Sequence, residues 1–193
     1  MKGEPLTTTG VLEMETLSPV AGEDVRLTSA IAGLVNDAYA VAGEGLWANG
    51  VRRTTAEEIA RFTRARQVAV ARVGGRIIGC VRVRQLAGGI GEFGMLAVDP
   101  SFRGMGVARE MVRFAEQVAR KERCDVMQLE VLVPCNRSHS FTKFLTGWYT
   151  RIGYKPVRTA AIEEYYPDLS RFLATPCYFI IHHKDLRGSM RAT

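Results

Sequence analysis

The residues with the clearest capacity to bind a ligand are two glycines one residue apart, Gly104 and Gly106, in the stretch DPSFRGMGVAREMVRF (99–114). They fall where an apolar, strand-like run gives way to a helix-like run. Such a turn leaves free backbone N–H groups at a helix N-terminus, where the helix dipole also favours an anion, most often a phosphate. Taken alone, a glycine-rich turn that binds nothing would be the better interpretation.

Two other phosphate-binding loops are excluded by the spacing of these glycines. A P-loop requires Gly-Lys followed by Ser or Thr, and the sequence contains no such triplet. A dinucleotide-binding loop requires a third glycine, but Arg109 stands at that position. The glycines therefore need a different explanation.

Glu92, in the stretch GEFGML (91–96), is the main candidate for proton transfer. It is an ionisable residue on an apolar run that leads to the glycine turn. Partial burial would raise its pKa toward a value that suits a general base. The alternative is a salt bridge with Arg82 or Arg84, and the residues favour the base only slightly. His139, in a polar loop, is the reserve candidate.

The elements that must position these residues follow from hydrophobic periodicity and turn signals. Strands are expected at 11–17, 67–73, 76–86, 90–98, 126–133 and 177–184, and helices at 23–42, from Thr54 or Thr55 to about Arg66, at 106–123 and at 141–154. The glycine pairs at 74–75 and 88–89 mark hairpin turns, so the middle three strands form an antiparallel meander. The order predicts a mixed α/β domain around one sheet.

Composition bounds the domain count and the location. The chain has 193 residues, of which 47% are hydrophobic and 24% charged, and this suits one domain, placed at 11–187 between a flexible start (1–10) and a tail (188–193). No apolar run is long enough for a membrane span or a signal peptide. The four cysteines form no CxxC pair, which predicts reduced, mostly buried thiols in a cytoplasmic protein without a metal site.

The net charge of +6 predicts an anionic partner. The basic residues are scattered rather than massed on one segment, so a nucleic acid is the weaker alternative and an anionic small molecule the stronger one. His182 and His183 are adjacent on an expected strand and therefore point to opposite faces, which argues against a shared metal site.

The stretch RGMGVA (103–108) matches the [Q/R]-x-x-G-x-[G/A] motif of the GCN5-related N-acetyltransferases (GNAT). Joined to WYTRIGY (148–154), it makes the chain resemble that superfamily from about Glu23 to Lys184. The resemblance implies an α/β (α+β) GNAT fold with a mixed, mostly antiparallel sheet of about six to seven strands and about four helices. It also implies acetyl-CoA as co-substrate, held by Leu96, Ala97, Val98, Arg103, Gly104, Met105, Gly106, Val107, Ala108 and Arg109.

The same resemblance assigns two catalytic roles. Tyr149 occupies the place of the family's tyrosine near the thioester sulfur, where its hydroxyl would help the departing thiolate. A buried packing role is its alternative. Glu92 lies on the strand where several members carry a glutamate base. An asparagine of the family that contacts the cofactor is replaced by Thr142 here, and Asn136 lies further back, so the asparagine's role is not transferred.

The expected function is transfer of an acetyl group from acetyl-CoA to a primary amine of a small molecule, directly in a ternary complex. Acceptor sites of the family lie in the segments that correspond to 43–53 and 161–176. The second is acidic and aromatic, with Glu163, Glu164 and Asp168, which suits a cationic amine, whereas Arg52 and Arg53 suit a carboxylate. Protein lysine or N-terminal acetylation and a non-catalytic acetyl-CoA-binding domain are the alternatives. A homodimer is possible.

Overall fold

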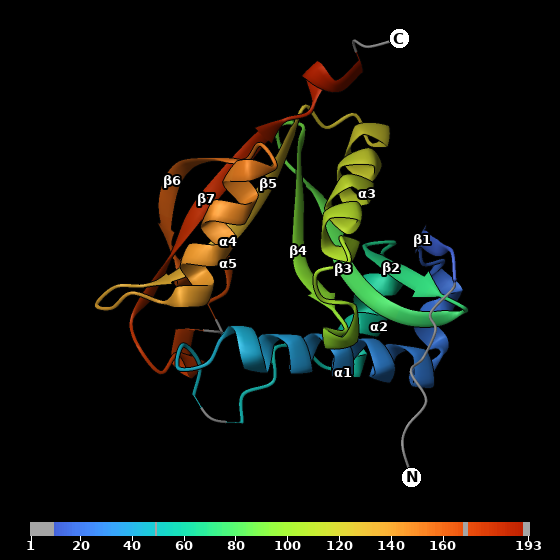
Figure 1. Ribbon diagram of the computed structural model, residues 1–193, viewed down its shortest axis with the longest axis horizontal. Coiled ribbons are helices and arrows are strands. Elements are labelled where there is room, and N and C mark those ends of the chain that lie inside the picture. The colour runs from blue at the N-terminus through green and yellow to red at the C-terminus, as the bar shows by residue number, and fades with distance from the viewer. Residues whose placement is uncertain (1–9, 49, 168–169, 191–193) are drawn as a thin grey trace.

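The computed structural model describes residues 10–48, 50–167 and 170–190, and within them seven strands form one sheet (Figure 1). The order across the sheet is β1-β2-β3-β4-β5-β7-β6. Neighbouring strands are antiparallel except for β4 and β5, which are parallel. The predicted mixed, mostly antiparallel sheet is confirmed. The strands are β1 (Leu12–Thr16), β2 (Val68–Val73), β3 (Arg76–Leu86), β4 (Ile90–Val98), β5 (Val126–Pro134), β6 (Lys155–Ala161) and β7 (Cys177–Asp185).

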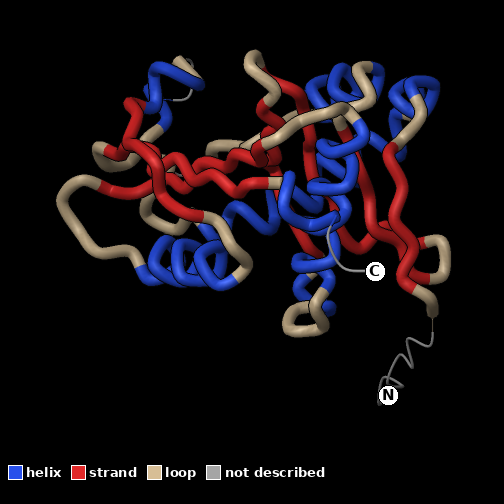
Figure 2. Tube along the Cα trace, turned by 90° about the horizontal axis from the view of Figure 1, so that it is seen from above, coloured by secondary structure: helices blue, strands red, loops and turns tan. Residues whose placement is uncertain are grey.

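Helices cover both faces of the sheet (Figure 2). Ile31 and Val35 of α1 and Ile59 of α2 pack on one face, in a cluster with Val70 and Ala97. The α3 helix and the Tyr149 end of α4 pack on the other face. The α-helices are α1 (Val25–Ala42), α2 (Ala56–Arg64), α3 (Val107–Lys121), α4 (Ser140–Arg151) and α5 (Ile162–Tyr165), and short 3-10 helices occupy Pro19–Glu23, Pro100–Phe102, Ser170–Phe172 and Arg187–Met190.

Local capping explains where the first two α-helices begin. The Asp24 carboxylate accepts hydrogen bonds from the N–H groups of Arg26 and Leu27 at 2.9 and 3.0 Å. The Thr55 hydroxyl accepts one from the N–H of Glu58 at 3.1 Å, and the Glu58 carboxylate accepts one from the Thr54 hydroxyl at 2.8 Å. Between them lies the predicted loop, and its end is fixed because Asn36 Oδ1 accepts from the N–H groups of Arg53 and Thr54.

One strand and one short helix were not predicted. The sequence of β6, KPVRTAA, has neither alternation nor an apolar run and predicts a loop, because almost all of its residues are exposed in the sheet. It lies at the edge of the sheet, pairs only with β7, and tolerates Pro156 because an edge strand has free N–H positions. The four-residue α5 follows directly and raises the number of α-helices to five.

The thiols are less buried than predicted. Cys80 and Cys124 are buried, but Cys177 is half-buried and Cys135 is exposed at the end of β5. Among the described residues, no helix is long and apolar enough to cross a bilayer, and no group of three or more His, Cys, Asp or Glu side chains could hold a metal ion. Residues 1–9 and 191–193 of the expected terminal segments lie outside the described residues.

The sheet divides between β4 and β5. The two strands pair only over Ile90–Glu92 and Val126–Gln128, and then they separate, as Figure 1 shows. On β4 the separation coincides with an irregularity in the pairing to β3, and Met95 within it has a φ of 52°, unusual for a residue with a side chain. Among the described residues, β4 beyond Glu92 and β5 beyond Gln128 form no strand pairs along the edges that face each other. The sheet therefore opens at its centre.

A buried carboxylate joins α3 to the second half of the sheet. Glu116 of α3 is 4% exposed. It accepts hydrogen bonds from the Tyr154 hydroxyl at 2.9 Å and from Lys184 Nζ at 2.8 Å, and Arg120 lies 3.8 Å away. Because a buried carboxylate is costly without such partners, this network fixes α3 against β7 and the segment after α4.

We expect Glu116→Ala to lower the free energy of unfolding by about 3 kcal/mol, because it leaves the buried Tyr154 hydroxyl and the half-buried Lys184 ammonium without their acceptor. Urea unfolding measures the loss. The control is Glu110→Ala on the same helix, which removes an exposed pair with Arg113 and should change stability by less than about 1 kcal/mol. Equal effects of the two substitutions would contradict the role given to Glu116.

Candidate active site

The opening between β4 and β5 holds a cleft with a volume of about 540 Å³. Its walls are the separated halves of the two strands, the start of α3 and one face of α4, and the C-terminal half of α1 closes one end. The sequence-predicted residues Leu96, Ala97, Val98, Arg103, Gly104, Gly106, Val107, Ala108, Arg109 and Tyr149 all line it. The structure thus brings together most of the predicted site.

The glycine turn presents its backbone to the cleft. Gly104 and Gly106 both have a φ of 81°, a conformation that favours glycine. A Cβ atom at either position would meet no atom within 4 Å, so open space lies in front of them. Gly106 caps α3, and the N–H groups of Val107, Ala108 and Arg109 belong to its first turn, where no helical carbonyl is available.

Met105, between the two glycines, is placed differently. Its side chain is 67% exposed and does not line the cleft. Its N–H donates to the carbonyl of Phe102 at 3.3 Å. A contribution of Met105 to cofactor binding stays a prediction, and the structure gives it less support than it gives to its glycine neighbours.

The edge of β4 is available along the cleft. Ala97 and Val98 pair with Cys80 and Gly79 of β3 on one side, whereas β5 has moved away on the other. An extended ligand could therefore add to β4 as a strand does. This agrees with the predicted place of the pantetheine arm beside Leu96, Ala97 and Val98.

Tyr149 faces the cleft from α4. The residue is 7% exposed, and its ring packs near those of Phe93 and Tyr154. Burial raises the pKa of Tyr149, so the hydroxyl is protonated at neutral pH. Tyr154 donates its hydroxyl to Glu116, but no hydrogen-bond partner of the Tyr149 hydroxyl occurs among the described residues. Its hydroxyl is thus available to a ligand.

Glu92 does not line the cleft. It is 3% exposed and forms two hydrogen bonds with Arg84, at 2.7 and 2.9 Å. The pair is directly opposite on β3 and β4. The salt bridge considered from the sequence is therefore present, with Arg84 rather than Arg82. Arg82 instead donates to Gln67 and stacks on the ring of Phe62. The role of Glu92 as a base stays a prediction.

A second carboxylate, Glu130 of β5, was not singled out from the sequence and does line the cleft. It lies two positions beyond Gln128, where β5 leaves β4. Burial, together with the charge of Glu92 and a hydrogen bond with it, raises the pKa of Glu130 to about 7. The Gln128 side-chain amide nitrogen donates to the Glu130 carboxylate at 2.8 Å, and the Gln128 side-chain oxygen lies 2.9 Å from Nε2 of His183. Glu130 is thus held in place with a pKa near neutrality.

His139, the reserve base, serves the structure of a loop. Its Nδ1 accepts from the N–H of Thr142 at the start of α4, and its Nε2 lies 3.1 Å from the carbonyl oxygen of Glu44. Neither nitrogen faces the cleft. Thr142, in the place of the family's asparagine, lines the cleft and donates to the carbonyl of Leu132 at 3.1 Å. Asn136 is exposed and does not line the cleft.

The α1–α2 loop borders the end of the cleft opposite the glycine turn, through Leu46 and Trp47. Ala48 N–H donates to the carbonyl of Phe172 at 2.8 Å, and Ala174 N–H donates to that of Leu46 at 2.9 Å. These bonds join the α1–α2 loop to the segment before β7. We name this end of the cleft the acceptor chamber, which is lined by Tyr39, Leu46, Trp47, Arg53, Glu130, Tyr166 and Phe179.

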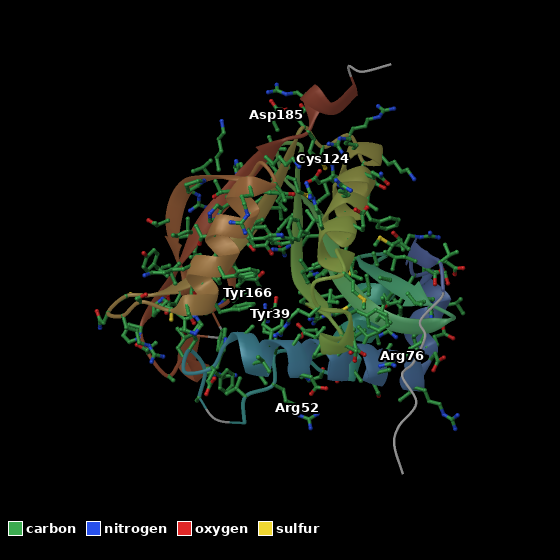
Figure 3. All side chains as sticks on the ribbon, in the orientation of Figure 1. Tyr39, Arg52, Arg76, Cys124, Tyr166 and Asp185 are labelled. Carbon is green, nitrogen blue, oxygen red and sulfur yellow. The ribbon has the colours of Figure 1, made fainter. Side chains whose placement is uncertain are left out.

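Two of the three acidic residues predicted to meet a cationic amine lie outside this chamber. Glu163 and Glu164 do not line it, and Glu164 pairs with Arg158 at 2.9 Å. Asp168 lies outside the described residues. Figure 3 shows Tyr39 and Tyr166 close together at the open end of the sheet, whereas Arg52 lies on the far side of α1. Of the two predicted arginines, only Arg53 lines the cleft.

Residues 37–146 match the model of the acetyltransferase (GNAT) family, and the chain belongs to that family. It is an acetyltransferase that uses acetyl-CoA, as the sequence predicted. No curated protein matches the chain.

Solved structures share the fold at low sequence identity. PaiA N-acetyltransferase from Thermoplasma acidophilum, in complex with coenzyme A, has a TM-score of 0.65 and 15% identity over 91% of this chain and 99% of that one. The ribosomal-protein-S18-alanine N-acetyltransferase from Escherichia coli has a TM-score of 0.57 and 12% identity, over 95% and 99%. IAA acetyltransferase from Bacillus cereus has a TM-score of 0.56 and 14% identity, over 91% and 99%. The names of these three proteins refer to different activities, so the shared fold does not identify the acceptor of this chain.

We expect Gly106→Val to weaken acetyl-CoA binding about 10- to 100-fold, because a branched side chain would occupy the space where the pyrophosphate should meet the backbone. Calorimetric titration measures the affinity. Gly88→Val is the matched control, since Gly88 also has a positive φ, of 75°, and open space around it but lies outside the cleft. If a folded Gly106→Val variant binds like the control, the cofactor lies elsewhere.

Proposed function

We propose that the acceptor is a primary amine of a small molecule and that the acetyl group passes to it directly in a ternary complex. The observation that carries this proposal is that the α1–α2 loop, which contributes Leu46 and Trp47 to the acceptor chamber, is tied by hydrogen bonds at Leu46 and Ala48 to the segment Phe172–Ala174. A lysine in the middle of a folded protein surface needs an open groove. A chamber bordered by a loop that is tied to a second segment suits a compact molecule better.

The test of this proposal is acetyl-CoA turnover with a panel of small primary amines and, in parallel, with peptides that offer a lysine or a free N-terminus. Faster turnover of small amines than of any peptide supports it. Preference for a peptide would favour the protein acetyltransferase, and binding of acetyl-CoA without turnover of any amine would favour a regulatory domain. A cytoplasmic location and a homodimer remain predictions from the sequence.

The roles of the chamber residues follow from the needs of the reaction. An amine is mostly protonated at neutral pH and must lose a proton before or during its attack on the thioester carbonyl carbon. Glu130 suits this role, because it lines the cleft and its pKa is near 7. The C–S bond then breaks, and the departing thiolate needs a proton, which the protonated Tyr149 hydroxyl can donate.

We expect Tyr149→Phe to reduce turnover roughly 10²- to 10⁴-fold, the range typical of general acid–base groups, with acetyl-CoA affinity nearly unchanged. The substitution keeps the buried ring and removes only the hydroxyl. Steady-state kinetics and calorimetry on the same preparation separate the two effects. A variant with wild-type turnover would show that Tyr149 only packs the core.

Glu130 predicts a specific pH dependence. The wild-type rate should fall as the pH drops through about 7, because the base is then protonated. Glu130→Gln should reduce turnover by roughly 10²- to 10⁴-fold and abolish this acidic limb.

Glu92→Gln decides between the two carboxylates. If Glu92 acts by raising the pKa of Glu130, its neutralisation should move the acidic limb to lower pH and preserve turnover above it. The melting temperature should fall, because Arg84 loses its partner. Loss of turnover at every pH, with Glu130→Gln still active, would instead identify Glu92 as the base.

A further inference from the structure

Arg53 is held in a fixed position in the acceptor chamber. Its guanidinium carbon lies 5.5 Å from the ring centroid of Tyr39 and 5.5 Å from that of Tyr166. The backbone N–H of Arg53 donates to Oδ1 of Asn36 on α1 at 2.8 Å, and this bond fixes the backbone at Arg53. A guanidinium between two aromatic rings is oriented and partly desolvated before any ligand arrives.

The charge of Arg53 is not matched by a carboxylate within the part of the chain that the structure describes. None of the ion pairs among these residues includes Arg53. Arg84, by contrast, is engaged by Glu92 through two hydrogen bonds. The planar guanidinium fork binds a carboxylate through two parallel hydrogen bonds, which makes Arg53 a fitting receptor for one.

Arg53, Glu130 and Tyr166 line the same cleft, and the Arg53 guanidinium carbon lies 5.5 Å from the centroid of the Tyr166 ring. A small acceptor could therefore place its amine at Glu130 and an anionic group at Arg53. A polyamine would instead bring a second positive charge against Arg53, with the exposed Asp37 on α1 as the other acid that lines the cleft.

The remaining surface of the chamber is apolar. Leu46 is 4% and Phe179 is 7% exposed, and the Trp47 side chain packs in the same cluster as Phe179. Leu46 and Trp47 both come from the α1–α2 loop. The body of an acceptor that fills this space is therefore expected to be apolar.

We propose that the acceptor is an amino acid with an apolar side chain, an inference that rests on the proposed function. Its carboxylate binds Arg53, its amine faces Glu130, and its side chain contacts Leu46, Trp47 and Phe179. The amine nitrogen forms the new bond to the acetyl carbon, its proton passes to Glu130, and the thiolate leaves.

The experiment compares phenylalanine and leucine with their amides, which keep the amine and the side chain but lack the carboxylate. Phenethylamine completes the panel. The wild type should acetylate the acids with a kcat/KM about 10- to 100-fold above that of the amides, the range expected for charge-assisted hydrogen bonds. Arg53→Gln should lower kcat/KM for the acids by a similar factor and leave that for the amides unchanged. Arg52→Gln, outside the cleft, is the matched control and should alter neither.

The outcomes separate this inference from the proposed function. Amides acetylated as well as the acids, or an Arg53→Gln variant that retains the preference, would overturn the inference and leave a small-molecule acetyltransferase in place. Acetylation of phenethylamine alone would do the same. If acetyl-CoA binds but no acid, amide or amine is turned over, both proposals fail.

Discussion

The structure depends on the separation of two neighbouring parallel strands. β4 and β5 share only the rungs at Ile90–Glu92 and Val126–Gln128, and beyond them each strand has backbone groups that face no other strand. Backbone N–H and C=O groups in the interior must find partners. An extended ligand with its own amide groups can supply them, so the opening that weakens the sheet at its centre also creates the cofactor site. The glycine turn at the end of β4 then lies directly in line with the same edge.

The same separation controls the electrostatics of the site. Glu92 lies on the last rung, opposite Arg84, where the sheet is closed and the side chain is sealed from the cleft. Glu130 lies beyond that rung, where the sheet is open. Burial and the nearby charge of Glu92 raise the pKa of Glu130 to about 7. The carboxylate that a substrate could reach is therefore the one that can exchange a proton near neutral pH.

Much of this arrangement could be predicted from the sequence, because periodicity and capping are local. The strands of the meander, the helices α1 to α4 and the glycine turn occur where the pattern placed them. β6 was missed because an exposed edge strand lacks the alternation that burial imposes. Glu130 was missed because the stretch VMQLEVLV was treated only as a buried strand. The signal was present, since an acid in an apolar run was the argument used for Glu92. Which carboxylate faces the cleft depends on where the strands separate, which is a long-range property.

We propose that acetyl-CoA lies in the opening between β4 and β5 and reacts beside Glu130 and Tyr149. A crystal structure with bound coenzyme A provides the test. We expect the pyrophosphate against the N–H groups of Gly106, Val107 and Ala108, the pantetheine arm along Leu96 to Val98, and the sulfur within hydrogen-bonding reach of the Tyr149 hydroxyl. A cofactor bound elsewhere, or a sulfur remote from both Tyr149 and Glu130, would contradict it.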